Sequence, residues 1–135
     1  MDNKVDVFYY SLLLVPLHLG VHWCLTVVDM EKLEIEYYDS LGNSNTPHAP
    51  QALMSYLKME HMDKKQRPLP LLEYWSTFIG RDIPKQNNYS DCGMFICKFA
   101  EYRSRMSSFT FNSDHMPYYR RRMIFEIVNK TLMCP

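Results

Sequence analysis

Cys92 is the residue of this sequence best suited to covalent chemistry, because of the segments on either side of it. A polar loop of turn-forming residues, 87–90, leads up to it, and Phe95 and Phe99 follow at helical spacing. We therefore expect Cys92 at the first turn of a helix, where unpaired backbone N–H groups and the helix dipole stabilise negative charge. A thiolate is favoured at such a position, so Cys92 is a candidate nucleophile.

A cysteine nucleophile needs a base, and the chain offers candidates upstream. His22 and Asp39 each stand within or at the end of an apolar run that predicts a strand. A carboxylate near an imidazole fixes its tautomer and stabilises the imidazolium. Gln86, six positions before Cys92, offers a side-chain amide that could donate to an oxyanion during acyl transfer.

The order of these residues resembles that of the SUMO-specific (sentrin-specific) cysteine protease family, the ubiquitin-like-protein-specific proteases. Residues 15–23 are similar to the family's histidine block, 38–42 to its aspartate block and 115–123 to the C-terminal helix of its SUMO-directed branch. The motif residues, in chain order, are His22-Trp23, Asp39, Gln86 and Asp91-Cys92-Gly93. The resemblance covers nearly the whole chain.

The resemblance implies an α+β fold of the papain-like cysteine protease class, with an antiparallel sheet packed by helices. It implies hydrolysis of the bond after the C-terminal Gly-Gly of SUMO, in the precursor and in isopeptide conjugates to target lysines. Cys92 would attack the glycine carbonyl, His22 would carry the proton and Asp39 would orient His22. Gln86 and the Cys92 backbone N–H would bind the oxyanion, with no metal or cofactor.

Two residues are expected on the substrate side. A tryptophan is ordinarily a core residue, but the resemblance places Trp23 beside the narrow tunnel that holds the Gly-Gly tail. His18 stands at an even offset from His22, which puts both on one face of a regular strand, although Gly20 lies between them. Tyr89 departs from the family pattern, because close relatives usually have glycine there.

The remaining reactive groups are expected to be structural. The other cysteines are interpreted as buried, inert hydrophobes and the other histidines as surface residues: Cys24, Cys97 and Cys134; His48, His61 and His115. Asp91 is expected to act mainly as the helix N-cap. Successive residues 120–122 are arginines that point in different directions on a helix, which favours a solvated face over a nucleic-acid site.

The elements that must position these residues follow from periodicity. Apolar and alternating runs predict strands over 5–17 (with its end at Pro16), 23–30 and 33–38. These three consecutive strands could form a meander. Another strand is predicted over 71–79. Helices are predicted from residue 50 or 51, over 92–106 and over 113–132. Met123, Ile127 and Val128 give the inner face of the last helix, with Tyr119 or Arg120 one turn earlier.

Composition narrows the partners and the compartment. Fifteen basic and 15 acidic residues give a formal net charge of zero, so no global charge draws the chain to nucleic acid or membrane. The four cysteines include no CxxC pair, which argues against a zinc site and suits a reducing compartment. With the resemblance, this predicts the nucleus, with the cytoplasm as a second location. No apolar run could span a bilayer, and no signal peptide is evident.

A complete catalytic domain of the resembled family is considerably longer than 135 residues. Residues 1–135 are therefore expected to be its C-terminal portion, apparently N-terminally truncated, without part of the modifier-binding surface and the second wall of the tunnel. Three alternatives stay open: a SUMO-binding module with weak or no turnover, a protease for another ubiquitin-like modifier, and an acyltransferase with the same His-Asp-Cys order.

Overall fold

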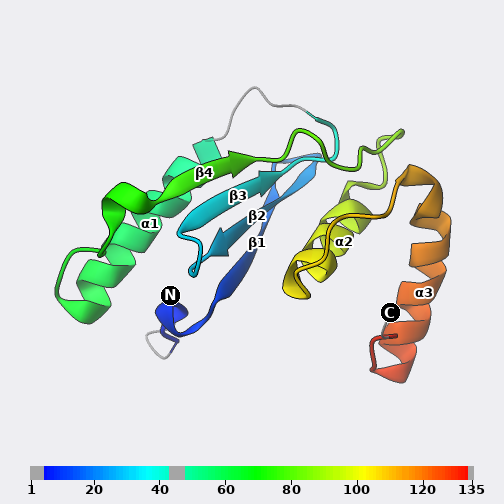
Figure 1. The fold of residues 1–135 in the computed structure, drawn as a ribbon. Helices are drawn as coiled ribbons and strands as arrows, with labels where there is room; N and C mark the ends of the chain where they lie inside the picture. The colour runs from blue at the N-terminus through cyan, green and yellow to red at the C-terminus, as the bar shows by residue number, and fades with distance from the viewer. Residues whose placement is uncertain (1–4, 43–47, 134–135) are drawn as a thin grey trace.

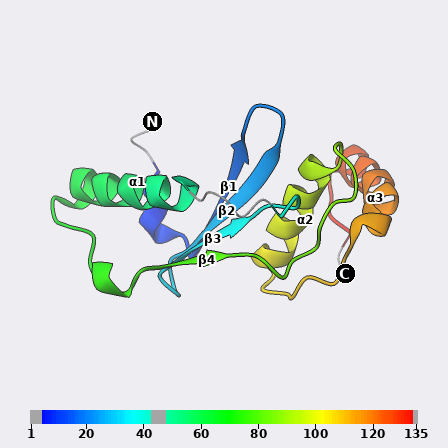
Figure 2. The ribbon, with the colours of Figure 1, turned by 90° about the horizontal axis from the view of Figure 1, so that it is seen from above.

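A computed structural model describes residues 5–42 and 48–133 of the protein. Its elements in chain order are η1 (Val7–Tyr9), β1 (Leu12–His18), β2 (Trp23–Asp29), β3 (Glu34–Tyr38), α1 (His48–Lys65), η2 (Leu72–Tyr74), β4 (Ser76–Ile79), α2 (Cys92–Ser104), η3 (Ser113–His115) and α3 (Met116–Asn129). Helix α1 covers one face of the sheet and α2 the other, while α3 lies outside α2 (Figure 1, Figure 2). The α+β class is therefore confirmed.

The sheet has the order β1-β2-β3-β4. The first three strands form the expected antiparallel meander, but β4 pairs with β3 in parallel, so the sheet is mixed rather than wholly antiparallel. The long connection through α1 and η2 returns the chain to the starting end of β3, and such a crossover is what a parallel neighbour requires. The predicted strand over 71–79 is shorter, because η2 occupies its first part.

Strand β1 differs from the buried strand predicted over 5–17. The chain there begins with η1, and β1 continues through Pro16 to His18, with its residues alternating between half-buried and exposed along most of its length. Because β1 is an edge strand, one of its sides has no hydrogen-bonding partner strand and a proline is tolerated. β2 and β3 are central and largely buried on both faces, so the half-buried third strand predicted from alternation is also corrected.

Each face of the sheet has its own apolar core. Towards α2, Leu25 and Tyr38 pack against Phe95 and Phe99, and both phenylalanines are fully buried. The Tyr38 and Phe99 rings stack with centroids 5.5 Å apart. Towards α1, Val28, Ile35 and Leu57 form the second cluster. These two cores fix the start of α2 relative to the ends of the central strands.

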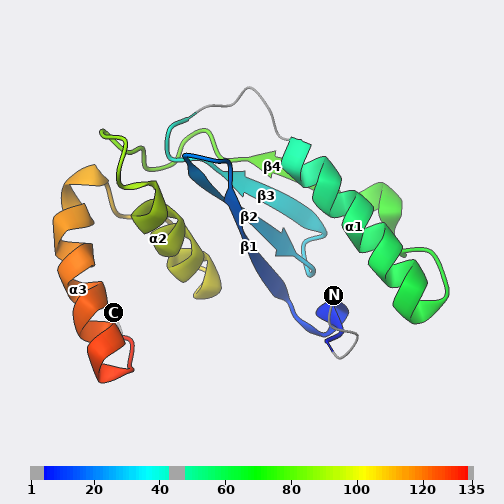
Figure 3. The same ribbon diagram turned by 180° about the vertical axis from the view of Figure 1, so that it is seen from behind.

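The predicted inner face of the last helix is wrong for its C-terminal half. Ile127 and Val128 are 69% and 73% exposed, and α3 packs against α2 through Met116, Tyr119 and Met123 instead. Seen from behind, α2 separates α3 from the sheet (Figure 3). Periodicity identifies apolar positions, but it does not tell which of them a neighbouring element covers.

Two structural expectations are corrected. His61 is buried rather than on the surface: its Nδ1 donates to the Arg67 carbonyl at 2.8 Å, and its ring meets the Phe8 ring edge-on. Cys97 is exposed, on a part of α2 that does not face the sheet. Cys24 is buried as predicted, and Cys134 lies outside the described residues. Within residues 5–42 and 48–133, no helix combines the length and apolar character needed to cross a bilayer.

Candidate active site

His22 is held in the tight connection between β1 and β2. The Leu19 backbone N–H donates to the His22 carbonyl at 2.7 Å, which leaves Gly20 and Val21 as the loop. Gly20 has φ of 85°, a conformation that glycine adopts without strain and that a two-residue hairpin loop requires at its first position. The hairpin thus presents the His22 ring at a defined place.

Asp39 immediately follows β3 and receives the His22 ring. His22 Nε2 lies 2.7 Å from Asp39 Oδ1, and only 13% and 8% of the two side chains are exposed. The Leu41 backbone N–H also donates to Oδ1, at 2.9 Å, which fixes the carboxylate. A carboxylate oxygen accepts hydrogen bonds, so this contact favours the tautomer in which Nε2 donates, and Nδ1 is then the ring nitrogen available for proton exchange.

Cys92 is the first residue of α2, as predicted, and is only 8% exposed. Cys24, in β2, is close to the His22–Asp39 pair: its sulfur and polar atoms of His22 and Asp39 all lie within 4.8 Å of one another. Helix α2 packs against the strand that carries Cys24, since Phe95 and Leu25 belong to one buried cluster. The loop before Cys92 is tied to Ser40, the residue after Asp39, through the Gln86 backbone N–H.

Cys24 itself is unsuited to catalysis. It is fully buried, and burial raises the pKa of its thiol to about 12, so it stays protonated at neutral pH. The Tyr37 hydroxyl donates to its sulfur at 3.3 Å. The set His22, Cys24 and Asp39 has the ligand types of a metal site, but His22 and Asp39 are paired with each other and the Cys24 sulfur accepts from the Tyr37 hydroxyl.

Gln86 is fixed by the loop before the nucleophile. Its backbone N–H donates to the Ser40 carbonyl at 2.9 Å, and the Ser40 hydroxyl donates to its side-chain Oε1. Its Nε2 donates to the Asn88 carbonyl at 2.7 Å. One of the two amide protons is therefore committed to the loop, and the other is the one that an oxyanion could use.

His18 and Trp23 face each other across the β1–β2 pair, with ring centroids 4.5 Å apart. His18 ends β1 whereas His22 lies outside the strands, just before β2, so the expected placement of both histidines on one strand face is wrong. Trp23 is 38% exposed and stands next to the exposed loop residue Val21. The two rings form a partly exposed aromatic pair next to the β1–β2 loop.

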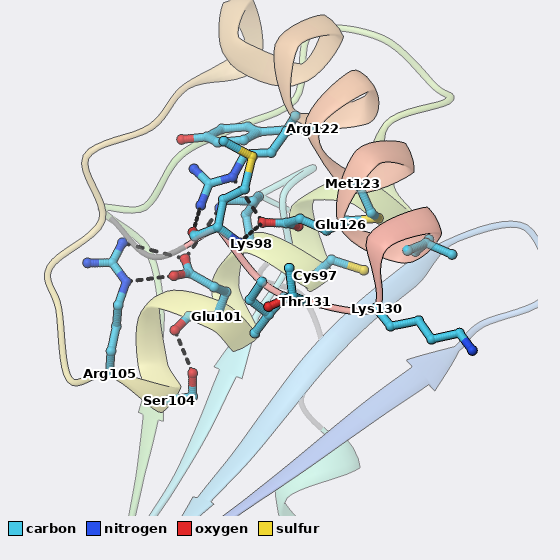
Figure 4. A pocket seen from close by; sticks show the side chains of 14 residues that line it. Cys97, Lys98, Glu101, Ser104, Arg105, Arg122, Met123, Glu126, Lys130 and Thr131 are labelled. Atoms are coloured by element: carbon cyan, nitrogen blue, oxygen red, sulfur yellow. Dashed lines mark hydrogen bonds and ion pairs between the residues drawn. The ribbon is translucent and has the colours of Figure 1, made fainter.

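Two cavities differ in their relation to these residues. One of about 370 Å³ includes both His22 and Asp39 in its lining, together with Leu19 and His48. Another of about 570 Å³ lies between α2 and α3 and includes Cys97 (Figure 4). Charges in its walls pair with each other, as in Arg122 with Glu126. Since none of the candidate catalytic residues lines it, it is a separate feature.

Sequence reasoning missed the role of the residues that hold the nucleophile loop. Asp91 occupies the N-cap position, but its side chain does not cap the helix. It accepts instead from Asn88 Nδ2 at 2.7 Å and from Arg120 Nη2 at 2.5 Å. Asn88 could be found from its turn-forming character, whereas Arg120 is 29 residues from Asp91 and no local pattern connects them.

An imidazole–carboxylate pair and a cysteine at a helix start are the groups that cysteine-dependent acyl-transfer enzymes use. The chain belongs to the Ulp1 protease family: the C-terminal catalytic domain of that family matches residues 1–132. The family resemblance seen in the sequence is thereby confirmed.

Relatives of this chain are named sentrin-specific proteases. A sentrin-specific protease of Caenorhabditis elegans is 48% identical over 131 residues, which are 97% of this chain and 18% of that protein. Sentrin-specific protease 2 of Mus musculus is 40% identical over 96% of this chain and 22% of its own length. The chain thus spans about a fifth of the length of these relatives.

Solved structures share the fold. The SUMO protease Ulp1 with its catalytic cysteine oxidised to a sulfonic acid superposes with a TM-score of 0.77 at 25% identity, over 94% of this chain and 57% of that one. The Ulp1 protease domain in complex with Smt3, the yeast ortholog of SUMO, gives 0.73 at 26% identity, over 93% and 56%. The likeness supports a SUMO-protease fold that this chain covers in part.

Proposed function

We propose that this chain carries the catalytic residues of a SUMO-specific cysteine protease, which hydrolyses the bond after the C-terminal Gly-Gly of SUMO. The observation that carries the proposal is the 2.7 Å contact between His22 Nε2 and Asp39 Oδ1, in a fold that puts Cys92 at the first residue of α2. The SUMO-protease names of the relatives and the Smt3 complex of Ulp1 support the choice of substrate.

The first half of the reaction forms a thioester. The Cys92 thiol gives its proton to His22 Nδ1, and the thiolate attacks the carbonyl carbon of the terminal glycine. The oxygen of the tetrahedral intermediate accepts from the Cys92 backbone N–H and from the second amide proton of Gln86. When the intermediate collapses, His22 protonates the departing amine, which is the target lysine or the precursor's next residue.

The second half releases SUMO. Water attacks the thioester carbon as His22 removes its proton, and the Cys92 thiolate leaves, so that the terminal glycine becomes a free carboxylate. Asp39 stays ionised throughout, holding the ring orientation and stabilising the imidazolium. A Gly-Gly tail has no side chains, so its recognition depends on backbone hydrogen bonds and on an aromatic wall such as Trp23.

The test is a SUMO probe ending in a vinyl sulfone, with the adduct located by mass spectrometry. We expect labelling at Cys92, complete loss of the adduct in Cys92→Ala, and full labelling in Cys97→Ala. Cys97 is the matched control because it lies on the same helix and is more exposed. An adduct on Cys97, or one that persists in Cys92→Ala, would contradict the assignment.

Labelling by different probes, together with SUMO binding, separates the remaining alternatives. Labelling by a different ubiquitin-like probe but not by SUMO would indicate another modifier. SUMO binding without labelling would indicate a binding module, which the partial coverage of the Ulp1 structures keeps as the second candidate. We propose the nucleus as the main location, and the distribution of the tagged protein in cell fractions checks it.

A further inference from the structure

The residue before the nucleophile is the centre of a hydrogen-bonded cluster, the Asp91 clamp, made of Asn88, Asp91 and Arg120. Arg120 on α3 reaches Asp91 Oδ1 through Nε at 3.2 Å and through Nη2 at 2.5 Å, and Nη2 also donates to the Ser90 carbonyl at 3.2 Å. Asn88 Oδ1 accepts from the Ser90 and Asp91 backbone N–H groups, both at 3.0 Å. The clamp therefore joins α3 to the last turn before Cys92.

A carboxylate at this position has an electrostatic consequence for its neighbour. The Asp91 side chain makes no cap hydrogen bond to α2, so it does not satisfy the helix N–H groups. The hydrogen bond from Asn88, and then the pairing with Arg120, lower the pKa of Asp91, so it is ionised at neutral pH. An unbalanced negative charge beside a thiol disfavours the thiolate, and a nearby cation removes that penalty.

We propose that Arg120 is a positioning residue for Cys92: it balances the charge of Asp91 and fixes the junction between the loop and α2. The inference rests on the proposed function only in taking Cys92 as the nucleophile. Arg120 does not touch the reacting atoms. It acts through Asp91. Because Arg120 lies on α3, the surroundings of Cys92 depend on how α3 is oriented.

Other charged or titratable groups also face this region. His22 precedes β2 and Asp39 follows β3, and the Cys24 sulfur lies within 4.8 Å of their polar atoms. The loop contributes Asp91, and α3 contributes Arg120. Substitutions at Asp91 and Arg120 leave the His22–Asp39 pair in place, so they change one source of charge at a time.

The pH dependence of Cys92 alkylation by iodoacetamide tests the inference. The 135-residue chain is used with Cys97→Ala, so that Cys92 is the most exposed cysteine left among the described residues, and fragment mass spectrometry confirms the site. In Arg120→Gln we expect the midpoint of the rate profile to rise by about 0.5–1 pH unit, or ~3–10-fold less thiolate below the midpoint. Raising the salt to about 1 M should shrink this shift, because Arg120 is half-exposed.

Three further variants give the controls. Arg121→Gln removes a neighbouring exposed arginine and should leave the midpoint unchanged. Asp91→Asn should lower the midpoint, since Arg120 is then an unbalanced cation, and this variant keeps the test valid if Arg120→Gln does not fold. The double variant Asp91→Asn/Arg120→Gln should return the midpoint towards that of the parent chain.

The inference is overturned if Arg120→Gln and Arg121→Gln share one midpoint, or if Asp91→Asn fails to reverse the shift. A purely structural role would lower the melting temperature without moving the midpoint in opposite directions for the two substitutions. Because iodoacetamide needs no SUMO, the outcome is independent of substrate: chains that never cleave SUMO but show the opposed shifts would refute the proposed function and leave this inference standing.

Discussion

The His22–Asp39 hydrogen bond determines which ring nitrogen can exchange a proton. Asp39→Asn keeps the volume of the side chain but removes the charge that stabilises the imidazolium, and its amide can force the wrong tautomer. We expect kcat for a SUMO–fluorophore substrate to fall by roughly 10²–10⁴-fold, as for the orienting acid of other triads.

The measurement needs a protein with detectable turnover and an aspartate control. Asp63→Asn, on the exposed end of α1, should change kcat by less than twofold. A decrease of less than about threefold in Asp39→Asn, below roughly 1 kcal/mol of barrier, would show that Asp39 is not the partner of His22.

The Asp91–Arg120 pair also predicts a pH dependence of stability. Because the folded-state pKa of Asp91 lies below its ordinary value of 3.8, the stabilisation is fully present above that value and is lost as the pH falls through the folded pKa. Wild type should exceed Asp91→Asn by roughly 1 kcal/mol at pH 7 in urea unfolding. The difference should vanish near pH 2, and a difference that is constant with pH would contradict the assignment.

At the scale of elements, α2 is held to the sheet by a buried charge cluster. Arg103 donates from Nε and Nη2 to Glu36 at 2.6 and 2.7 Å, and from Nη2 to Asp29 at 3.2 Å. The Tyr38 hydroxyl donates to the same Glu36 carboxylate at 2.7 Å. Cys92 begins this helix, next to the Asp91–Arg120 pair, and the charge cluster lies at its other end, so both ends of α2 are fixed.

Arg103→Leu should strongly destabilise the protein, because two buried carboxylates lose their cation. Breaking a buried pair from one side costs roughly 3–5 kcal/mol, measured here as the free energy of urea unfolding. Arg105→Leu is the matched control, since this arginine pairs with Glu101 on the open side of the same helix and should cost little. Equal losses in the two variants would show that the buried cluster does not anchor α2.

Local sequence predicted the type of most elements and the places of the candidate catalytic residues within them. His22, Asp39 and Cys92 stand at strand ends and at a helix start, which are features of a short window. The parallel direction of β4 and the pairing of Asp91 with Arg120 each depend on how two segments far apart in the sequence meet. A short stretch of sequence does not contain both segments. Burial of His61 likewise depends on the side of α1 that faces Phe8.

At the scale of the whole molecule, much apolar surface of the described residues is uncovered. On α3, Ile124, Phe125, Ile127 and Val128 are each more than half exposed. A contiguous exposed apolar patch of this kind marks an interaction surface or an aggregation risk. The Ulp1 structures are longer than this chain, which covers 57% of one of them.

We therefore expect the 135-residue chain alone to self-associate at high concentration and to cleave SUMO weakly. Fusion to the N-terminal part of a relative's catalytic domain should raise both the melting temperature and kcat/KM. We expect the gain in kcat because the part of the Ulp1 fold that this chain does not cover would add contacts to a tail that we propose to lie on Trp23, and misplacement by about 1 Å can cost roughly a hundredfold. The two proteins are compared at equal concentration by light scattering, thermal melts and SUMO–fluorophore hydrolysis. A short chain that stays monomeric, melts cooperatively and cleaves as fast as the fusion would show that the exposed surface has no such role.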